Sequence, residues 1–178
     1  VKRVEISRNR IEAALNRGIM ILPDAAATNI RRVRIADNQI INAAVIPIDV
    51  NGAPLTNVLE NIVVEGNVVT GTVAVATAIH VDYGAEIVVR DNHVSVGAAA
   101  GSIDIKPQST LVISGNRSYS ILVGEPTAFA SATDTTITAN QVYHYISVQT
   151  VATGNYLLVA NNNLSDAGGG ILDSSVGR

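Results

Sequence analysis

The chain of 178 residues has no cysteine, no tryptophan and one phenylalanine, and aromatic residues make up only 3% of it. Without cysteine, disulfide bonds are excluded as the basis of the fold, and the redox compartment cannot be read from the sequence. The hydrophobic 47% of the chain is mainly Val, Ile, Leu and Ala. Because β-branched residues favour strands over helices, this composition predicts an all-β protein.

Long apolar runs and a strongly basic composition are also absent. No run approaches the ~20 apolar residues that cross a bilayer as a helix, so we expect no membrane insertion. The net charge of −3 argues against binding to nucleic acid. Basic residues concentrate in residues 1–34, where eight basic and three acidic residues give a net charge of +5, and the remainder of the chain has −8. This segment is either a solvated basic surface or a docking region for an acidic partner.

A repeat of 22–29 residues runs along the whole chain. Each copy reads apolar, any residue, apolar, two residues, Asn, any residue, then usually apolar, and its asparagines are Asn9, Asn38, Asn67, Asn92, Asn116, Asn140 and Asn162. A second alternating triplet follows each asparagine, at residues 19–21, 46–48, 79–81, 103–105, 121–123, 146–148 and 171–173. Such alternation predicts strands with one buried face. Strands repeated at this period predict a single right-handed parallel β-helix, a solenoid of about seven coils over residues 1–178.

The asparagines are expected to be structural. Asparagine tolerates the left-handed backbone conformation that a sharp turn between strands requires. In stacked coils the seven side chains would lie ~4.8 Å apart, so that each amide donates to the next. Each such hydrogen bond contributes ~1 kcal/mol.

With this repeat and its asparagine ladder, the chain resembles the pectate-lyase-like superfamily of right-handed β-helices over residues 4–173. That superfamily includes polysaccharide lyases, glycoside hydrolases, uronate epimerases, phage tailspikes and non-enzymatic surface proteins. The resemblance implies an extracellular or cell-surface protein that binds or processes polysaccharide, although no signal peptide is visible and the chain is either whole or a segment of a longer protein. None of the full catalytic signatures is present, so whether it is an enzyme stays open.

Stacking converts sequence positions into columns on the outer surface. The triplet at residues 46–48 is aligned with the triplet at residues 79–81, which places Asp49 beside Asp82. Five ionisable residues are then expected in one catalytic patch: Asp49, His80, Asp82, Asp104 and Lys106. Paired carboxylates would suit glycoside hydrolysis. Alternatively, Asp49 and Asp82 would hold calcium while His80 or Lys106 removes a proton from a uronate. An ordinary charged surface is the remaining interpretation.

A second candidate site consists of tyrosines. Tyr119 and Tyr143 both stand three residues after a ladder asparagine, so they should lie side by side, with Tyr145 two residues further on. Tyrosine presents a flat apolar face with a polar tip, which suits the binding of sugar rings. Tyrosine pairs across strands also stabilise sheets without any ligand.

A third column is apolar although it faces outward. The first strand of the repeat places Glu5, Arg34, Val63, Val88, Val112, Thr136 and Leu158 in one column. Outer apolar stripes usually mark a covered surface, here one covered by a further domain or by the partners of a homotrimer. The competing function is therefore a non-catalytic structural or adhesion module, such as a tailspike or surface-fibre segment.

Overall fold

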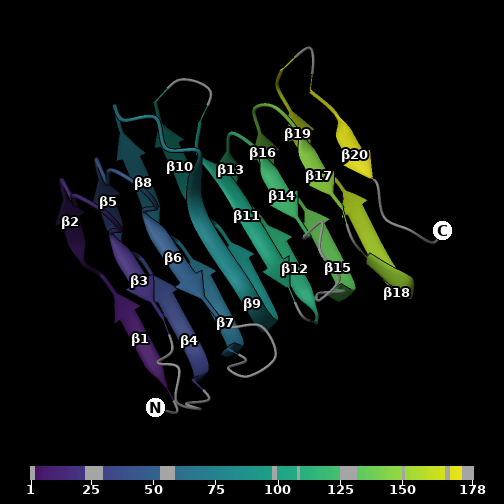
Figure 1. Ribbon diagram of the computed structural model, residues 1–178. Helices are drawn as coiled ribbons and strands as arrows, with labels where there is room; N and C mark the ends of the chain where they lie inside the picture. Colours follow the sequence, from purple (N-terminus) through teal and green to yellow (C-terminus); the bar gives the residue numbers. More distant parts are fainter. Residues whose placement is uncertain are drawn as a thin grey trace.

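The computed structural model describes residues 3–22, 30–52, 59–97, 100–107, 109–124, 132–149, 151–166 and 169–173. Every regular element in these ranges is a β-strand, and the strands stack in parallel from the N-terminal to the C-terminal coil (Figure 1). The predictions of an all-β chain and of a parallel solenoid are confirmed. The right-handed sense, which β-crossovers adopt almost without exception, stays a prediction.

Each coil contributes strands to three faces. The first face consists of β1 (Val4–Ser7), β4 (Arg31–Ala36), β7 (Leu59–Glu65), the end of β9 (Thr77–Arg90), β12 (Leu111–Ser114), β15 (Ala132–Thr138) and β18 (Val151–Ala160). The second consists of β2 (Arg10–Glu12), β5 (Gln39–Ile41), β8 (Val68–Gly71), β10 (His93–Val96), β13 (Arg117–Ser118), β16 (Gln141–Val142) and β19 (Asn163–Leu164). The third consists of β3 (Ile19–Ile21), β6 (Ile48–Asn51), the start of β9, β11 (Ser102–Pro107), β14 (Ile121–Val123), β17 (Ile146–Val148) and β20 (Ile171–Asp173).

The core is a set of aliphatic columns inside the coil. Ile35, Val64 and Val89 occupy the same first-face position in successive coils, and each is buried completely. The corresponding residues of the first and last coils, such as Ile6 and Val159, are only partly buried. The solenoid therefore makes about five turns covered on both sides, slightly fewer than the expected seven coils, because the two terminal coils each lack one neighbour.

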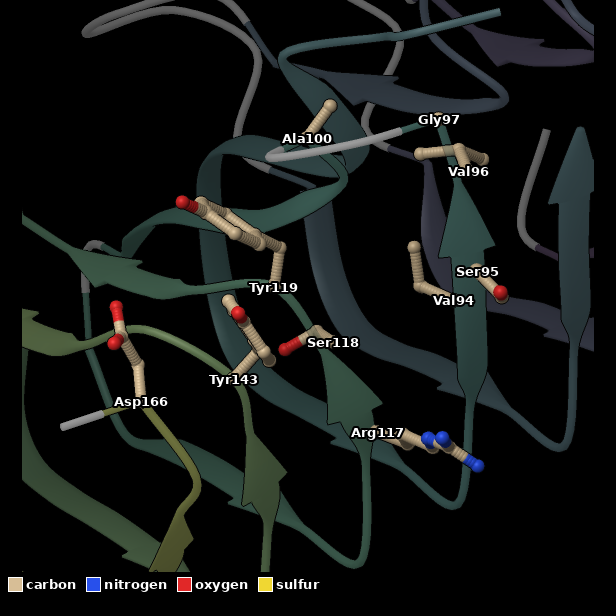
Figure 2. Close-up of a pocket in the computed structure, with 10 residues that line it drawn as sticks. All are labelled: Val94, Ser95, Val96, Gly97, Ala100, Arg117, Ser118, Tyr119, Tyr143 and Asp166. Carbon is tan, nitrogen blue, oxygen red and sulfur yellow. The ribbon is translucent and has the colours of Figure 1, made fainter. Parts of the chain in front are cut away.

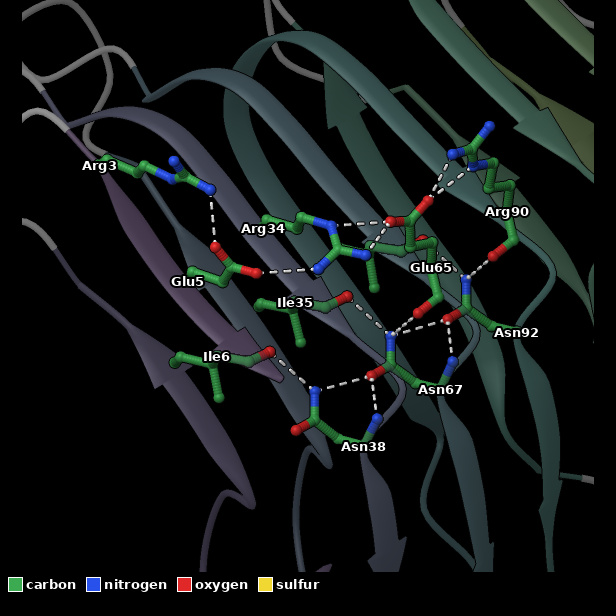
Figure 3. A network of polar contacts seen from close by, with 11 residues as sticks. Arg3, Glu5, Ile6, Arg34, Ile35, Asn38, Glu65, Asn67, Arg90 and Asn92 are labelled. Atoms are coloured by element: carbon green, nitrogen blue, oxygen red, sulfur yellow. Dashed lines mark hydrogen bonds and ion pairs between the residues drawn. The ribbon is translucent and has the colours of Figure 1, made fainter. Parts of the chain in front are cut away.

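The asparagine ladder runs along the whole stack, from Asn9 to Asn162. The backbone N–H and the Nδ2 of Asn67 both donate to Oδ1 of Asn92, at 3.0 and 2.9 Å, and Nδ2 also donates to the carbonyl of Ile35 (Figure 3). The same pattern links each ladder asparagine to the next, from Asn9 to Asn162. The interior amides are buried, so the ladder fixes the register of the coils.

One detail of the expected turn is wrong. The left-handed residue is the one before each asparagine: Arg8, Asp37, Gly66, Asp91, Gly115, Ala139 and Asn161, with φ between 55° and 65°. No ladder asparagine has a positive φ. The preceding residue turns the chain, and this turn aims the amide of the asparagine inward along the stack.

Glu65 joins three coils on the outside of the first face. Its carboxylate lies 2.7 Å from Nη2 of Arg34 and 2.6 Å from Nη2 of Arg90 (Figure 3). Hydrogen bonds from Arg90 and Arg34 lower the pKa of Glu65 although partial burial opposes this. The ion pair of Glu65 and Arg90 is thus part of a structural network.

Candidate functional site

An open groove of about 590 Å³ lies over β10 and β13 on the outside of the solenoid. Tyr119 and Tyr143 line one side and Val94 and Val96 the other, with Arg117 at one end (Figure 2). The walls come from three successive coils, so the hollow exists only because β10, β13 and β16 are stacked. We call this hollow the tyrosine groove.

Tyr119 and Tyr143 lie side by side, as predicted from their equal distance to the ladder. Ser118 and Val142, which precede them, are register partners in β13 and β16, and the Tyr143 N–H donates to the Ser118 carbonyl. The ring centroids are 5.5 Å apart and the planes differ by 24°. With 54% of Tyr143 exposed, the pair presents aromatic surface to solvent.

Tyr145 is oriented differently from the other two tyrosines. Its ring meets the edge of the His144 ring at 4.7 Å and 67°, while His144 stacks on Tyr119 at 5.3 Å and 22°. His144 Nδ1 lies 2.8 Å from Oδ2 of Asp166, which lines the groove. Tyr145 therefore supports the groove through His144 rather than lining it.

Sequence reasoning missed His144 and Asp166. Both lie just after second-face strands, on the turns toward the third face, where the repeat pattern is weak. The available signal was their separation of 22 residues, which equals the spacing of Asn140 and Asn162 and places them in adjacent coils.

Polar groups extend the surface of the groove along the solenoid. A neighbouring hollow of about 190 Å³ shares Arg117 and Tyr143 with the tyrosine groove, and Gln141 and Asn163 also line it. Arg117, Gln141 and Asn163 are register partners in successive coils and are all exposed. Guanidinium and amide groups can bind hydroxyl and carboxylate oxygens, so a polar column runs beside the aromatic pair.

The predicted catalytic patch lies on the third face in a corrected register. Asp49 pairs with His80 in the next coil, and His80 pairs with Asp104 in the one after. The expected strand at residues 46–48 is wrong, because β6 starts at Ile48 and Pro47 precedes it. Proline has no N–H for a ladder hydrogen bond. We call Asp49, His80 and Asp104 the polar row.

The remaining two residues of the patch occupy the next column. Asp82 pairs in register with Lys106, and Oδ2 of Asp82 lies 3.7 Å from Nζ of Lys106. The structure therefore brings all five residues together on two adjacent columns, but Asp49 and Asp82 do not share one. Their catalytic role stays a prediction.

Burial and pairing decide the charge states within the polar row. Asp49 is 2% exposed; burial alone would raise its pKa, but hydrogen bonds from His80, at 2.9 Å, and from Arg17 outweigh it and lower the pKa. Burial works against the charged form of His80, yet the hydrogen bond to Asp49 and the charge of Asp104 raise its pKa. Burial raises the pKa of Asp104.

Calcium fits the predicted ligands Asp49 and Asp82 poorly. The two oxygens of Asp49 are engaged by Arg17 and by His80, and a guanidinium at that position would repel a divalent cation. In the part of the chain that the structure describes, no group of three or more His, Asp or Glu side chains is arranged to hold a metal ion. Calcium binding stays a prediction.

We expect the melting temperature to pass through a maximum in mildly acidic solution. The pKa of His80 is raised above 6.5, so its pairing stabilises the fold below pH 6.5 and is lost as pH rises through the raised value. The pKa of Asp49 is lowered below 3.8, so its contribution is present above pH 3.8 and is lost as pH falls further. Thermal denaturation between pH 3 and 9 should show that His80→Gln flattens the decline above pH 6.5. Equal profiles for His80→Gln and wild type would contradict this account.

The predicted apolar column on the first face is confirmed. Val63, Val88 and Val112 are register partners, followed by Thr136 and Leu158. The three valines are partly exposed and line a shallow hollow of about 350 Å³. We call Val63, Val88, Val112 and Leu158 the valine stripe.

Comparison with known proteins gives no assignment. The chain matches no family model, and no curated protein or solved structure is significantly similar to it. Membership of the pectate-lyase-like superfamily in particular therefore stays a prediction, while the solenoid itself is shown. In the described ranges no helix is long and apolar enough to cross a membrane.

Proposed function

We propose that this β-solenoid binds polysaccharide through the tyrosine groove. The observation that supports the proposal most directly is the stacked pair of rings of Tyr119 and Tyr143, which stand beside an open hollow of about 590 Å³. Flat aromatic faces with polar tips suit rings that have both apolar C–H faces and hydroxyl edges. Arg117 and Asp166 supply charged groups at the margin of the same hollow.

The distribution of aromatic residues supports a ligand rather than a core role. The chain has five tyrosines, and three of them, Tyr119, Tyr143 and Tyr145, belong to this one cluster. The core consists of aliphatic columns and contains no aromatic residue among the described positions. Aromatic side chains are therefore not needed for packing, and they are gathered where the surface is hollow.

The shape of the site favours a polymer over a small molecule. The tyrosine groove is open to solvent and continues into the hollow beside Gln141 and Asn163. Its binding groups repeat from coil to coil at the strand spacing of ~4.8 Å. A surface with such repetition offers similar contacts to successive units of an extended chain.

We propose binding alone for the tyrosine groove and assign no catalytic activity to it. The polar row lies on the third face, whereas the tyrosine groove lies over the second. Asp49 is almost inaccessible to a polymer. An extracellular or cell-surface location is part of the proposal, because that is where a protein would meet such polymers.

Tyr143→Ala is expected to weaken polysaccharide binding about tenfold or more, which corresponds to ~1.4 kcal/mol, because the exposed ring supplies much of the apolar contact. A glycan array would identify the ligand, and calorimetric titration would measure the affinity. Tyr156→Ala is the matched control, since Tyr156 is 60% exposed and does not line the groove. Binding that is equally strong in both variants would refute the site, and the absence of any bound glycan would refute the function.

The valine stripe supports a second candidate, a non-catalytic spike module assembled as a homotrimer. Apolar side chains of three consecutive coils face outward there, and such patches often mark an interface. Light scattering should then give three times the chain mass, and Val88→Lys should reduce it to the monomer mass. A monomer in the unaltered chain would remove this candidate.

A further inference from the structure

Two coils of the solenoid are short between the asparagine ladder and the third face. One isoleucine position of the third-face strands is in register through every coil, at Ile19, Ile48, Ile79, Ile103, Ile121, Ile146 and Ile171. It follows the ladder asparagine by 9–12 residues in five coils, but by five residues after Asn116 and by six after Asn140. These two coils therefore turn from the second face to the third with fewer residues than their neighbours.

The tyrosine groove is the notch that these two short corners leave. Tyr119 directly follows β13 and Tyr143 directly follows β16, so both tyrosines lie on the shortened corners. The longer corner of the preceding coil contributes Gly97 and Ala100 to one wall, and the turn of the following coil places Asp166 beyond Tyr143 on the opposite side (Figure 2). The groove is therefore walled on both sides along the axis of the solenoid.

The groove also ends before the third face. Among the described residues, none of those that line it belongs to a third-face strand. Ser120, which follows Tyr119, is 2% exposed and lines neither the groove nor the neighbouring hollow. That neighbouring hollow extends over the second face, beside Gln141 and Asn163. The second face is thus the side on which a bound chain can leave the groove.

The volume of the groove fits a short part of a polymer. It measures about 590 Å³, within the ~300–1,000 Å³ of sites that hold one drug-sized molecule. An internal stretch of a polysaccharide is linked to a neighbour on each side and needs two exits from such a site. A terminal sugar unit is linked on one side only, so a single exit toward the second face is sufficient for it.

The polar groups of the groove also suit a terminal unit. Such a unit has an additional free hydroxyl, because one of its ring positions carries no linkage. Oδ2 of Asp166 lies 2.8 Å from Nδ1 of His144, and a carboxylate has about four acceptor positions. Asp166 can therefore accept a hydrogen bond from a sugar hydroxyl while it keeps its contact with His144.

We propose that the tyrosine groove recognises the terminal sugar unit of a polysaccharide. The ring of this unit packs against the tyrosine pair, and Asp166 accepts a hydrogen bond from its additional hydroxyl. The units that follow it lie over the column of Arg117, Gln141 and Asn163 on the second face. Terminal recognition rests on the proposed function and adds which part of the polymer is bound.

The number of protein chains that bind one polysaccharide chain tests terminal recognition. Calorimetric titration would use linear samples of the polysaccharide that the glycan array selects, fractionated by length. Because the two ends of a polysaccharide differ chemically, we expect one bound protein per chain at every length and an unchanged affinity. A number that rises in proportion to length would overturn terminal recognition and leave the proposed function standing. Absence of binding at every length would refute both.

Asp166→Ala tests the contact with the terminal unit. Loss of a hydrogen bond to a charged group should lower the affinity at least about tenfold, for the shortest and the longest fraction alike. Asp134→Ala is the matched control, because Asp134 is an exposed aspartate on the first face, away from the groove. Both variants should keep the circular dichroism spectrum of the unaltered chain. Full affinity of Asp166→Ala for every fraction would contradict the contact on which terminal recognition depends.

Discussion

Replacing Asn92 with leucine is expected to destabilise the solenoid by about 3–5 kcal/mol, the range that follows from leaving several buried polar groups unpaired at ~1–3 kcal/mol each. Oδ1 of Asn92 accepts from both the N–H and the Nδ2 of Asn67, and its Nδ2 donates to Val64, Arg90 and Asn116. Asn92 is 1% exposed, so water cannot replace these partners. Leucine has a similar volume, which confines the change to polarity.

Urea denaturation at neutral pH would measure this loss, and Asn9→Leu is the matched control. Asn9 lies at the exposed end of the same ladder and has a neighbour on one side only. Its substitution should cost less than ~1 kcal/mol because water can satisfy the groups left behind. Equal losses in the free energy of unfolding for the two variants would show that the ladder stabilises the fold no more inside the stack than at its end.

Asp49→Ala is expected to destabilise the fold by about 2–4 kcal/mol near pH 6, since it removes the shared partner of two basic side chains. Asp49 is buried between Arg17 and His80. Without the carboxylate, His80 loses the hydrogen bond that favours its charged form. Arg17 is partly exposed and can turn toward water, which keeps the loss toward the lower end of this range.

Glu60→Ala provides the comparison, because Glu60 pairs with Arg31 on an open surface and such pairs contribute ~0–1 kcal/mol. Chemical denaturation of both variants would show whether Asp49 is a structural residue. If Asp49→Ala were no less stable than Glu60→Ala, the buried ion pair would have no structural role. The prediction that Asp49 acts in catalysis would then regain support.

The repeat alone predicted the fold, because every coil has an asparagine that marks the same position. Columns close to this marker were correct, including Val63 with Val88 and Tyr119 with Tyr143. The predicted alignment of columns far from this asparagine was less accurate. In the second coil, Ile46, Ile48 and Val50 alternate in one frame, so apolar pattern alone permits two registers. Pro47 excludes one of them, and the true strand places Asp49 beside His80.

The candidate site was predictable only in part. Tyr119 and Tyr143 belong to a repeated column, so their contact followed from spacing. His144 and Asp166 lie on turns, where the repeat pattern is weak, so that only their separation of 22 residues pointed to their contact. Likewise, Asp49 pairs with Arg17, a turn residue of the preceding coil, which strand periodicity does not place.

The measurement that tests the central claim most directly is tyrosine fluorescence during titration with the polysaccharide that the glycan array selects. The chain has no tryptophan, so its emission comes from five tyrosines, and two of them line the proposed site. Binding in the tyrosine groove predicts a saturable change in emission with the same midpoint as the calorimetric titration, and loss of that change in Tyr143→Ala. A polysaccharide that binds with full affinity while the emission stays constant would contradict the claim.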